Sequence, residues 1–523
     1  MQVEAGHLVR HAAQRFGSRT ALSSPSRSLS FTELNDAANR VGSALIEAGV
    51  RRGDRVGVLA FNAPEVVVTW FGCEKHNLVR VVLHSHLPIE AHIWSLNHVE
   101  ASTLVFDTRF TADVERHRDQ IETVRHFVAI GADSPHWATP FPQLEQGGKD
   151  DDPYLDVDED SPCFLQLTSG TTGHPKAWVK TYRSWQAVIN HNLIHLDTFG
   201  PGVPPIDATD VNLHFHPIQW ASGFQTLYPY FVRGARSVLL DDEVFDPAVL
   251  LDTISWEGVT GLFMPGPLLT PVLDTIESRG RFEHRLRRMV VFFGTPELLQ
   301  RTTELMGPIW AHGFGATEQG AVTTRLLPVE VDERAERIHS VGRSGSPFLE
   351  VAVVDDHGRQ LPPNQTGEIV VRSAMSIGEY WAMPGKTAEA FLPGGWFRSM
   401  DVGHLDEEGF LYFSDRATEK ISIADEVVFP HLVEGAVLRH PAVANCGVVG
   451  LGETGAQQVV AAVRLKPEVA PSSGVADEIL ARTADLPATH RPTRVIFVDD
   501  LPTVFGGAKV QRHALREQLA SIT

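Results

Sequence analysis

A segment rich in glycine and hydroxyl residues, ending in a lysine, is the strongest chemical signal in the sequence. It reads TSGTTGHPK, runs from Thr168 to Lys176 and follows the apolar residues 164–167. Glycines let backbone N–H groups approach an anion closely, while hydroxyls and a lysine add donors and positive charge. This is the chemistry of a phosphate-binding loop, although the spacing differs from GxxxxGK[ST]. An ordinary surface loop has the same composition, so composition alone leaves both interpretations open.

Helix and strand signals alternate along the part of the chain that must position this loop. Ser30 and Glu33 have the spacing of a capping box, and apolar residues then repeat at helical period as far as Gly49. Short apolar runs predict buried strands at residues 55–60, 103–106, 127–130 and 289–293. The alternation predicts an α/β fold with mostly parallel sheets.

Changes in composition and in residue pattern along the sequence divide the chain into two domains. The acidic stretch 149–160 predicts an exposed connector between two α/β subdomains. After about residue 340, short strands at 350–355 and 368–372, bounded by turn residues, predict an antiparallel, β-barrel-like subdomain. We therefore predict a large N-terminal domain over residues 1–416, followed by a small α+β domain over residues 417–523.

Composition excludes several classes of partner. The 523 residues carry a formal charge of −20, which disfavours nucleic acid and anionic membranes as partners. A phosphate-binding protein of this charge must build a local cationic site. The three cysteines lie far apart, which argues against a disulfide framework or a zinc site. No apolar core of a signal peptide and no apolar run of about 18 residues occurs, so we expect a cytoplasmic protein.

Further motifs follow the phosphate-binding loop in a fixed order. They are HGFGATEQG (312–320), SVGRSGSP (340–347), TGEIVVR (366–372), GGWFRSMDVGHLDEEGFLYFSDR (394–416) and GGAKVQRHALRE (506–517). Together with the loop they resemble the motifs of the adenylate-forming superfamily of acyl-CoA synthetases, peptide-synthetase adenylation domains and firefly-type luciferases. The similarity begins at residues 29–59 and covers essentially the whole chain. It implies a large AMP-binding domain and a small, mobile C-terminal domain.

The resemblance implies a site for ATP. The phosphate loop would hold the triphosphate through Thr168, Ser169, Gly170, Thr171, Thr172 and Lys176. Adenine would stack on Phe314, and the rest of its site would come from Gly294, Thr295, Pro296, His312, Gly313 and Gly315. Asp401 would accept hydrogen bonds from the ribose hydroxyls, and Arg416 would contact the ribose from the domain junction.

The resemblance also implies three catalytic residues. Thr317 would bind the α-phosphate, and Glu318 would hold Mg²⁺, a hard cation that prefers oxygen ligands. Lys509, in the closing motif, would stabilise the negative charge that develops as the acid attacks the α-phosphorus.

Residues 212–224, NLHFHPIQWASGF, correspond to the segment that lines the acid pocket in the family. His216 and Trp220 are the candidate substrate contacts, and Trp220 with Phe224 favours a flat or apolar acid, such as an aryl acid. A metal site on His214 and His216 is an alternative, but two histidines without a third ligand are weak evidence for it. Simple packing is the third interpretation.

The sequence departs from the family in the loop after the domain junction. Ala424 and Asp425 replace two glycines that lie against the pantetheine arm in CoA-using members, so their side chains would crowd or repel that arm. Thr418 stands where the family usually has Asp or Lys, and Ala508 stands where Gly usually precedes the lysine.

Three functional hypotheses follow. The first is ATP- and Mg²⁺-dependent adenylation of a small, flat or aryl carboxylic acid, then transfer to a thiol, either CoA or a carrier protein. The second keeps the adenylation chemistry without CoA, with an amine acceptor or with nitrite as the activated acid, as in a diazotase-like ligase. The third is a binding protein that has lost catalysis, which Lys509, Glu318 and Asp401 argue against, because all three are present.

Overall fold

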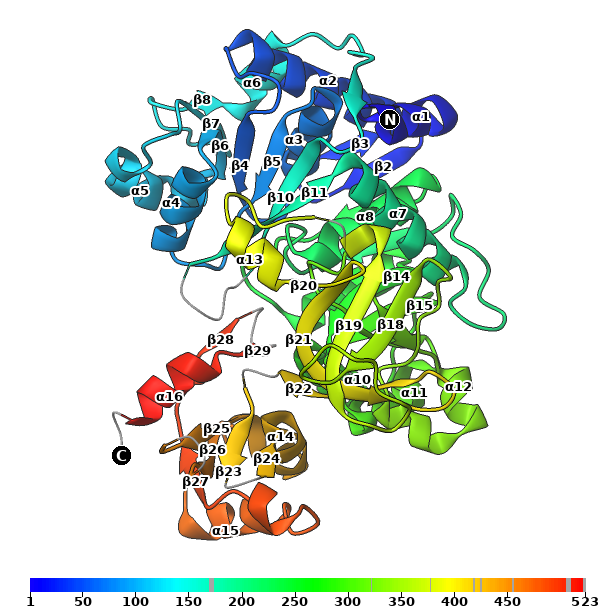
Figure 1. The fold of residues 1–523 in the computed structure, drawn as a ribbon. Coiled ribbons are helices and arrows are strands. Elements are labelled where there is room, and N and C mark those ends of the chain that lie inside the picture. The colour runs from blue at the N-terminus through cyan, green and yellow to red at the C-terminus, as the bar shows by residue number, and fades with distance from the viewer. Residues whose placement is uncertain are drawn as a thin grey trace.

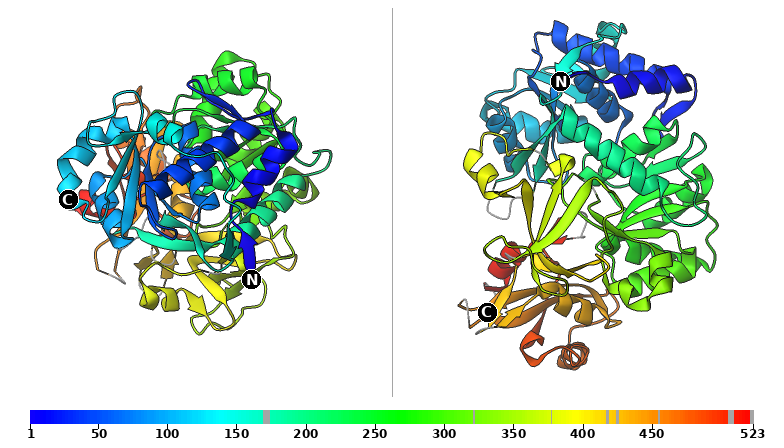
Figure 2. Two further views of the ribbon diagram at one scale, coloured as in Figure 1. Left: turned by 90° about the horizontal axis from the view of Figure 1, so that it is seen from above. Right: turned by 45° about the vertical axis from the view of Figure 1, so that its right-hand side comes forward.

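The computed structural model describes residues 1–168, 174–320, 322–376, 378–416, 419–423, 426–453, 456–504 and 509–520. Two α/β units and an antiparallel sheet make up the large N-terminal part, and a small α+β unit follows at the C-terminal end (Figure 1). Figure 2 shows the small unit below the antiparallel sheet, at the opposite end of the molecule from the N-terminus. This is the fold class predicted from the sequence.

A seven-stranded sheet forms the first α/β unit. In spatial order it contains β11 (Lys176–Thr181), β10 (Pro162–Thr168), β5 (Val79–Val82), β4 (Arg55–Leu59), β6 (Ala101–Asp107), β7 (His126–Ile130) and β8 (Thr139–Pro140). Neighbours pair in parallel except β10 and β11. Its helices are α2 (Phe31–Glu47), α3 (Pro64–Lys75), α4 (Ile89–His98), α5 (Thr111–His117) and α6 (Phe141–Gly147). Ser30 caps α2 in the predicted capping box.

An eight-stranded sheet forms the second α/β unit. Its order is β17 (Thr324–Leu326), β16 (Trp310–Phe314), β15 (Arg288–Phe292), β14 (Gly261–Pro265), β12 (Val211–His214), β13 (Arg236–Leu239), β2 (Thr20–Ser23) and β3 (Ser28–Ser30). Only the two edge pairs are antiparallel. Its helices are α8 (Ala221–Val232), α9 (Pro247–Glu257), α10 (Gly266–Arg279), α11 (Pro296–Met306) and α12 (Pro328–Glu333). Two helices contact both units: α1 (His7–Phe16) packs on α2 and α8, and α7 (Tyr182–Asp197) packs on α8 and on strands β10 and β11.

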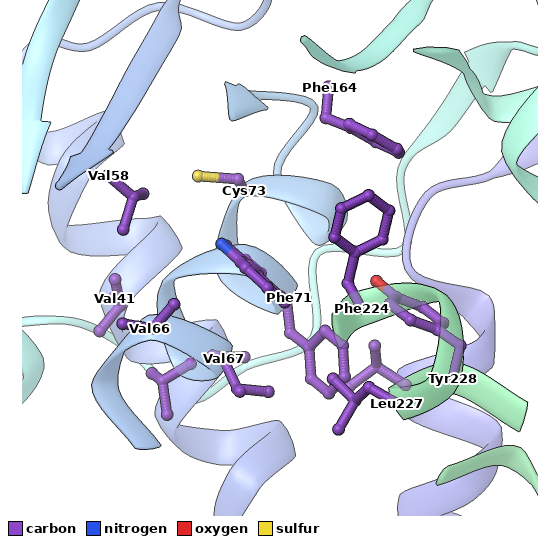
Figure 3. Close-up of a cluster of buried hydrophobic side chains, with 14 of the residues drawn as sticks. Val41, Val58, Val66, Val67, Phe71, Cys73, Phe164, Phe224, Leu227 and Tyr228 are labelled. Atoms are coloured by element: carbon purple, nitrogen blue, oxygen red, sulfur yellow. The ribbon is translucent and has the colours of Figure 1, made fainter. Parts of the chain in front are cut away.

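The two α/β units share a hydrophobic core between α2, α3 and α8 (Figure 3). Phe164 and Phe224 meet there with ring centroids 5.2 Å apart, and Phe71 meets Tyr228 at 5.5 Å. Each such ring contributes roughly 1.5–3 kcal/mol by its burial. Phe224 therefore packs in this core, so of the predicted pair Trp220 and Phe224 only Trp220 is left for substrate contact.

The antiparallel sheet follows the second unit. It contains β18 (Leu349–Val354), β19 (Gly367–Ser373), β21 (Trp396–Leu405), β20 (Phe391–Leu392) and β22 (Leu411–Arg416), with α13 (Pro384–Glu389) at its edge. All of its pairings are antiparallel. This half-barrel is the barrel-like unit predicted after residue 340.

The C-terminal unit is built on a three-stranded sheet of β25 (Val443–Leu451), β26 (Gln458–Leu465) and β27 (Arg494–Phe497). Two ribbons, β23 (Ile421–Ile423) with β24 (Glu426–Val428) and β28 (Thr503–Val504) with β29 (Lys509–Val510), accompany it. Its helices are α14 (Pro430–Leu438), α15 (Ser473–Ala481) and α16 (Arg512–Ala520). The mixed content confirms the predicted α+β class.

The acidic stretch at residues 149–160 is largely exposed, as predicted, but it does not connect two subdomains. It joins α6 to β10, which belong to the same unit, and its strand β9 (Asp156–Asp158) pairs with β1 (Gln2–Glu4). Asp152 bonds the buried Lys75 at 2.7 Å and also pairs with Arg10. Asp152 turns inward because two buried cations need a carboxylate partner, which a count of acidic residues does not reveal. In the described part of the chain, no helix has the length and apolar character that a membrane span requires.

Candidate functional site

The carboxyl ends of the parallel strands in the two large sheets meet at one edge. Asn62, just after β4, donates through Nδ2 to the backbone oxygens of His216, after β12, at 2.9 Å and of Leu240, after β13, at 3.0 Å. His84, after β5, contacts the backbone oxygen of Leu167 in β10 at 3.0 Å. Ligands of α/β sheets bind at carboxyl edges of this kind, and the predicted site residues at the ends of β10, β15 and β16 and after β12 lie along this one.

The phosphate loop is the connection of a β-hairpin. Thr168 at the end of β10 and Lys176 at the start of β11 are paired across the hairpin. Ser169, Gly170, Thr171 and Thr172 lie outside the described residues, as does the side chain of Thr168. The hairpin fixes both ends of the loop, which is the placement that a phosphate cradle after a strand requires.

Glu318 lies in the turn after β16, where Tyr380 bonds it. Tyr380 Oη donates to Glu318 Oε1 at 3.0 Å, and burial together with the charge of Glu318 raises the pKa of Tyr380. The Tyr380 ring packs edge-on against Trp178, with centroids 4.9 Å apart, and Lys176 Nζ lies 5.2 Å from its centroid. Tyr380 therefore links the lysine of the phosphate loop to the predicted Mg²⁺ ligand.

A buried lysine lies behind the same turn. Lys180 Nζ donates to the backbone oxygen of Met375 at 2.8 Å and lies 3.5 Å from the backbone oxygen of Glu318. Burial lowers the pKa of Lys180 to about 7, against the opposing effect of Glu318. The lysine ties β11, the turn with Glu318 and the segment around Met375 together.

The predicted ribose contacts form a pair. Asp401 in β21 and Arg416 in β22 are partners across the sheet, and Arg416 Nε lies 3.2 Å from Asp401 Oδ1. Asp401 is buried, and its backbone N–H donates to Ser399 Oγ at 3.0 Å. The Asp401 carboxylate is thus held by the Arg416 guanidinium at the end of the large domain. The two residues predicted to contact the ribose therefore lie next to each other.

The predicted adenine segment lies on β15 and β16. Gly313 pairs with Phe292, and Phe314 is only 9% exposed, with its ring 5.7 Å from that of Phe413. Thr295 caps α11 through Leu298 N, and Pro296 begins that helix. Burial lowers the pKa of His312 to about 4, so it is neutral at physiological pH.

His216 and Trp220 face one another beside β14. Their rings stack at 5.8 Å with an interplanar angle of 11°, and the His216 ring meets Phe263 edge-on at 5.3 Å. Burial lowers the pKa of His216 to about 4 and that of His214 to about 3, so both are neutral. His214 Nε2 instead contacts Asn212 Nδ2 at 2.9 Å.

The alternative interpretation, a metal site on His214 and His216, would require a third ligand. Within the described ranges, no group of three His, Cys, Asp or Glu side chains could hold a metal ion. Mg²⁺ that is shared with nucleotide phosphates needs only one or two protein carboxylates, and the partly exposed Glu318 fits that demand.

The C-terminal unit attaches through Asp415, the neighbour of Arg416. His431 N donates to Asp415 Oδ2 at 3.0 Å, and Arg512 Nη1 lies 3.9 Å from Oδ1. Burial opposes ionisation, but these partners lower the pKa of Asp415. Lys509 lies in β29 of this unit, paired with Val504, and its side chain is outside the described part. Ala424, Asp425, Thr418 and Ala508 also lie outside it.

Tyr380 and Lys180 were not among the residues singled out from the sequence. Tyr380 lies 62 positions from the glutamate it bonds, and an isolated bridge between Trp178 and Tyr380 brings it to β11. No local pattern encodes that bridge. For Lys180 a signal exists, because a lysine inside an otherwise apolar strand must find a special environment when buried.

Comparison with known proteins agrees with the geometry. Residues 9–381 match the AMP-binding enzyme family, and residues 432–504 match the AMP-binding enzyme C-terminal domain. An indoleacetate–CoA ligase of Aromatoleum aromaticum is 29% identical over 98% of each chain. A medium/long-chain-fatty-acid–CoA ligase of Mycobacterium tuberculosis is 29% identical over 98% of this chain and 89% of its own. The crystal structure of the anthranilate–CoA ligase AuaEII with anthranoyl-AMP is 25% identical, with a TM-score of 0.89 over 100% of this chain and 98% of its own. The chain therefore belongs to the AMP-binding enzyme family and is an adenylate-forming ligase.

Proposed function

We propose that the protein uses MgATP to activate a small, flat or aryl carboxylic acid as an acyl-AMP and then transfers the acyl group to a thiol, CoA or a carrier protein. The observation that carries the proposal is the presence of two anchored carboxylates: Glu318 in the turn after β16, bonded by Tyr380, and Asp401 in β21, bonded by Arg416. The relatives named for indoleacetate and anthranilate, two acids that carry an aromatic ring, support this substrate class, whereas the equally similar relative of Mycobacterium tuberculosis is named for fatty acids.

In the first step the acid carboxylate attacks the α-phosphorus of ATP, and the bond to the leaving pyrophosphate breaks. Lys176 and the loop that it closes would hold the triphosphate, and Thr317 would bind the α-phosphate. Asp401 would accept hydrogen bonds from the ribose hydroxyls. Mg²⁺ bound by Glu318 would neutralise phosphate charge when present.

In the second step a thiol attacks the acyl carbon, and AMP leaves. The proposal divides the chain into a large domain at residues 1–416 and a small domain at residues 417–523, with Lys509 acting in the first step. Asp415 and Arg416 adjoin this boundary and bond to opposite sides of it, which supports the division.

The test is pyrophosphate release from ATP with a panel of aryl and aliphatic acids, each with and without CoA. We expect release with aryl acids, and acyl-CoA only when CoA is added. Release that ignores CoA, or that requires nitrite and an aryl amine, would replace the thiol step with the second hypothesis. If neither any acid of the panel nor nitrite supports pyrophosphate release, adenylation itself is rejected.

The variant Asp425→Gly tests the acceptor directly. If the Asp425 side chain obstructs the pantetheine arm, the variant will raise the rate of acyl-CoA formation and leave pyrophosphate release measured without CoA unchanged. An unchanged CoA-dependent rate would count against the crowding argument drawn from the sequence.

A further inference from the structure

The two buried lysines of the described residues have different partners. Lys75, in α3, pairs with the carboxylate of Asp152 at 2.7 Å. Lys180, in β11, is 2% exposed, and its two acceptors are backbone oxygens, that of Met375 at 2.8 Å and that of Glu318 at 3.5 Å. Buried charges are ordinarily paired with an opposite charge, because an ammonium group is costly to remove from water. A lysine buried on carbonyl oxygens therefore calls for an explanation other than packing.

Both acceptors of this lysine lead to the predicted Mg²⁺ ligand. One is the backbone of Glu318 itself. The other, Met375, precedes Tyr380 in a segment that runs beside β11, where Trp381 N donates to the backbone oxygen of Ala177 at 2.8 Å. Tyr380 Oη then donates to Glu318 Oε1 at 3.0 Å. The ammonium group thus holds the backbone of the glutamate and also the segment that holds its carboxylate.

The end of the same turn is fixed by close packing. Gly320 has φ +90°, and a Cβ built on it would lie 2.8 Å from Met375 Cβ. Gln225 Nε2, from α8, donates to the backbone oxygen of Gly320 at 2.8 Å. The turn is therefore held at Gly320 by Gln225 and at Glu318 by Lys180, which leaves the carboxylate little freedom to move.

Strand β11 joins this turn to the phosphate loop. The strand begins at Lys176, whose Nζ lies 5.2 Å from the centroid of the Tyr380 ring, and Lys180 lies one residue before its end. Lys180 is buried and bonds the backbone of Glu318, so it acts through that residue and does not itself contact a ligand. One strand thus supplies a cation for the triphosphate and an anchor for the predicted metal ligand.

We propose that Lys180 is a positioning residue that holds the Glu318 carboxylate where it can share Mg²⁺ with the nucleotide phosphates. The proposal rests on the proposed function and deepens it by adding a residue behind the metal site. Mg²⁺ demands near-ideal octahedral geometry, so a misplaced carboxylate weakens metal binding more than it weakens the other contacts of the nucleotide. Loss of the ammonium group should therefore reduce the benefit of Mg²⁺ to ATP binding and leave metal-free binding unchanged.

The test is titration calorimetry of ATP onto the acid-free protein, in excess Mg²⁺ and in EDTA. The ratio of Kd in EDTA to Kd in Mg²⁺ is the Mg²⁺ advantage. Lys180→Met removes the ammonium group and keeps a flexible side chain of similar length. We expect it to lower the Mg²⁺ advantage about fivefold and to leave Kd in EDTA within about twofold of wild type. Lys180→Gln keeps a neutral donor, so it should give an intermediate Mg²⁺ advantage.

A double-mutant cycle with Glu318→Gln shows whether Lys180 acts through the carboxylate. In the Glu318→Gln background the positioned charge is already absent. Lys180→Met should therefore cause no further loss of the Mg²⁺ advantage in that background, because residues that act through one group are not additive.

Lys75→Met is the matched control, because Lys75 is the other buried lysine of the described residues. Its loss leaves Asp152 with Arg10 alone, so the Tm of the ligand-free protein should fall while the Mg²⁺ advantage stays at the wild-type value. Lys180→Met should lower Tm less than Lys75→Met does, since it breaks no bond to a carboxylate within the described residues.

Three results would overturn the proposal. An unchanged Mg²⁺ advantage in both Lys180 variants, whatever their Tm, would make Lys180 a structural residue. Equal losses of affinity in Mg²⁺ and in EDTA would assign it to the nucleotide rather than to the metal site. A further loss in the Glu318→Gln background would show that it acts elsewhere. Wild-type protein that binds no ATP in either condition would instead reject the proposed function, before any variant is compared.

Discussion

The predicted nucleotide side and the predicted acid side of the site are built from different chemistry. On the predicted nucleotide side, Glu318 is held by Tyr380 and Asp401 by Arg416, so this side consists of placed charges and hydrogen bonds. On the acid side, His216 and Trp220 stack with Phe263, and burial keeps the histidine neutral. Under the proposed function, charge would serve the part of the reaction that is common to every acid, whereas ring shape would distinguish one acid from another.

This difference has a physical basis. A triphosphate carries several charges and can be held only by cations, metal and oriented donors, whose interactions strengthen in a site shielded from water. A small apolar acid offers one charged group, and the rest of its binding energy must come from contact area and ring geometry. Substitutions on the nucleotide side should therefore affect all acids equally, and those on the acid side should change their order of preference.

The largest effect is expected from Glu318→Gln. Removing the charge of the predicted Mg²⁺ ligand should lower kcat/KM for adenylation about 100- to 1,000-fold with every acid, because charge on the phosphates loses its counterion. Pyrophosphate release across the acid panel measures this. Glu304→Gln, an exposed glutamate of α11, is the matched control and should keep wild-type rates. Losses of activity that differ strongly between acids would contradict the separation of nucleotide binding from acid recognition.

A smaller uniform effect is expected from Tyr380→Phe. The ring keeps its contact with Trp178, but Glu318 loses its 3.0 Å hydrogen bond, so the carboxylate is no longer held in one position. We expect the KM for MgATP to rise about five- to tenfold. Titrating Mg²⁺ at fixed ATP should show the same shift, and an unchanged Mg²⁺ dependence would remove Tyr380 from the metal site.

On the acid side, Trp220→Leu should change selectivity. Loss of the ring stacked on His216 should lower the benzoate-to-butyrate ratio of kcat/KM about fivefold. The KM for MgATP should remain near the wild-type value, since none of the nucleotide-side pairs involves this ring. Equal losses with both acids, or a raised KM for MgATP, would show that the acid side also supports nucleotide binding.

The sequence predicts these two sides unequally. The strand before the phosphate loop and the capped helix at Ser30 follow from local patterns, and both occur in the structure. The pairing of Asp401 with Arg416 depends on the register of β21 and β22, which only the resemblance to a family anticipates.

Other features need long-range structure that no local pattern encodes. Phe224 packs in the core because α8 faces α3, although its spacing from Trp220 favours a shared pocket. Asp152 of the acidic stretch turns inward because Lys75 and Arg10 are buried beside it. The left-handed backbone of Phe293 accompanies the close approach of Gly266, the first residue of α10, which follows the neighbouring strand β14.

The smallest effect concerns pH and stability. Because the pKa of folded His216 is about 4, the unfolded chain, with an ordinary histidine pKa near 6.5, binds a proton that the folded protein does not between these values. Stability is therefore lost as pH falls from about 6.5 towards 4. His216→Leu should reduce the fall in unfolding free energy between pH 7 and pH 5 by about 1–2 kcal/mol. Chemical denaturation at both pH values measures this, with the exposed His357→Gln as control. An equal fall in wild type and variant would mean that His216 is charged in the folded protein, and the acid side would then share the charge chemistry of the nucleotide side.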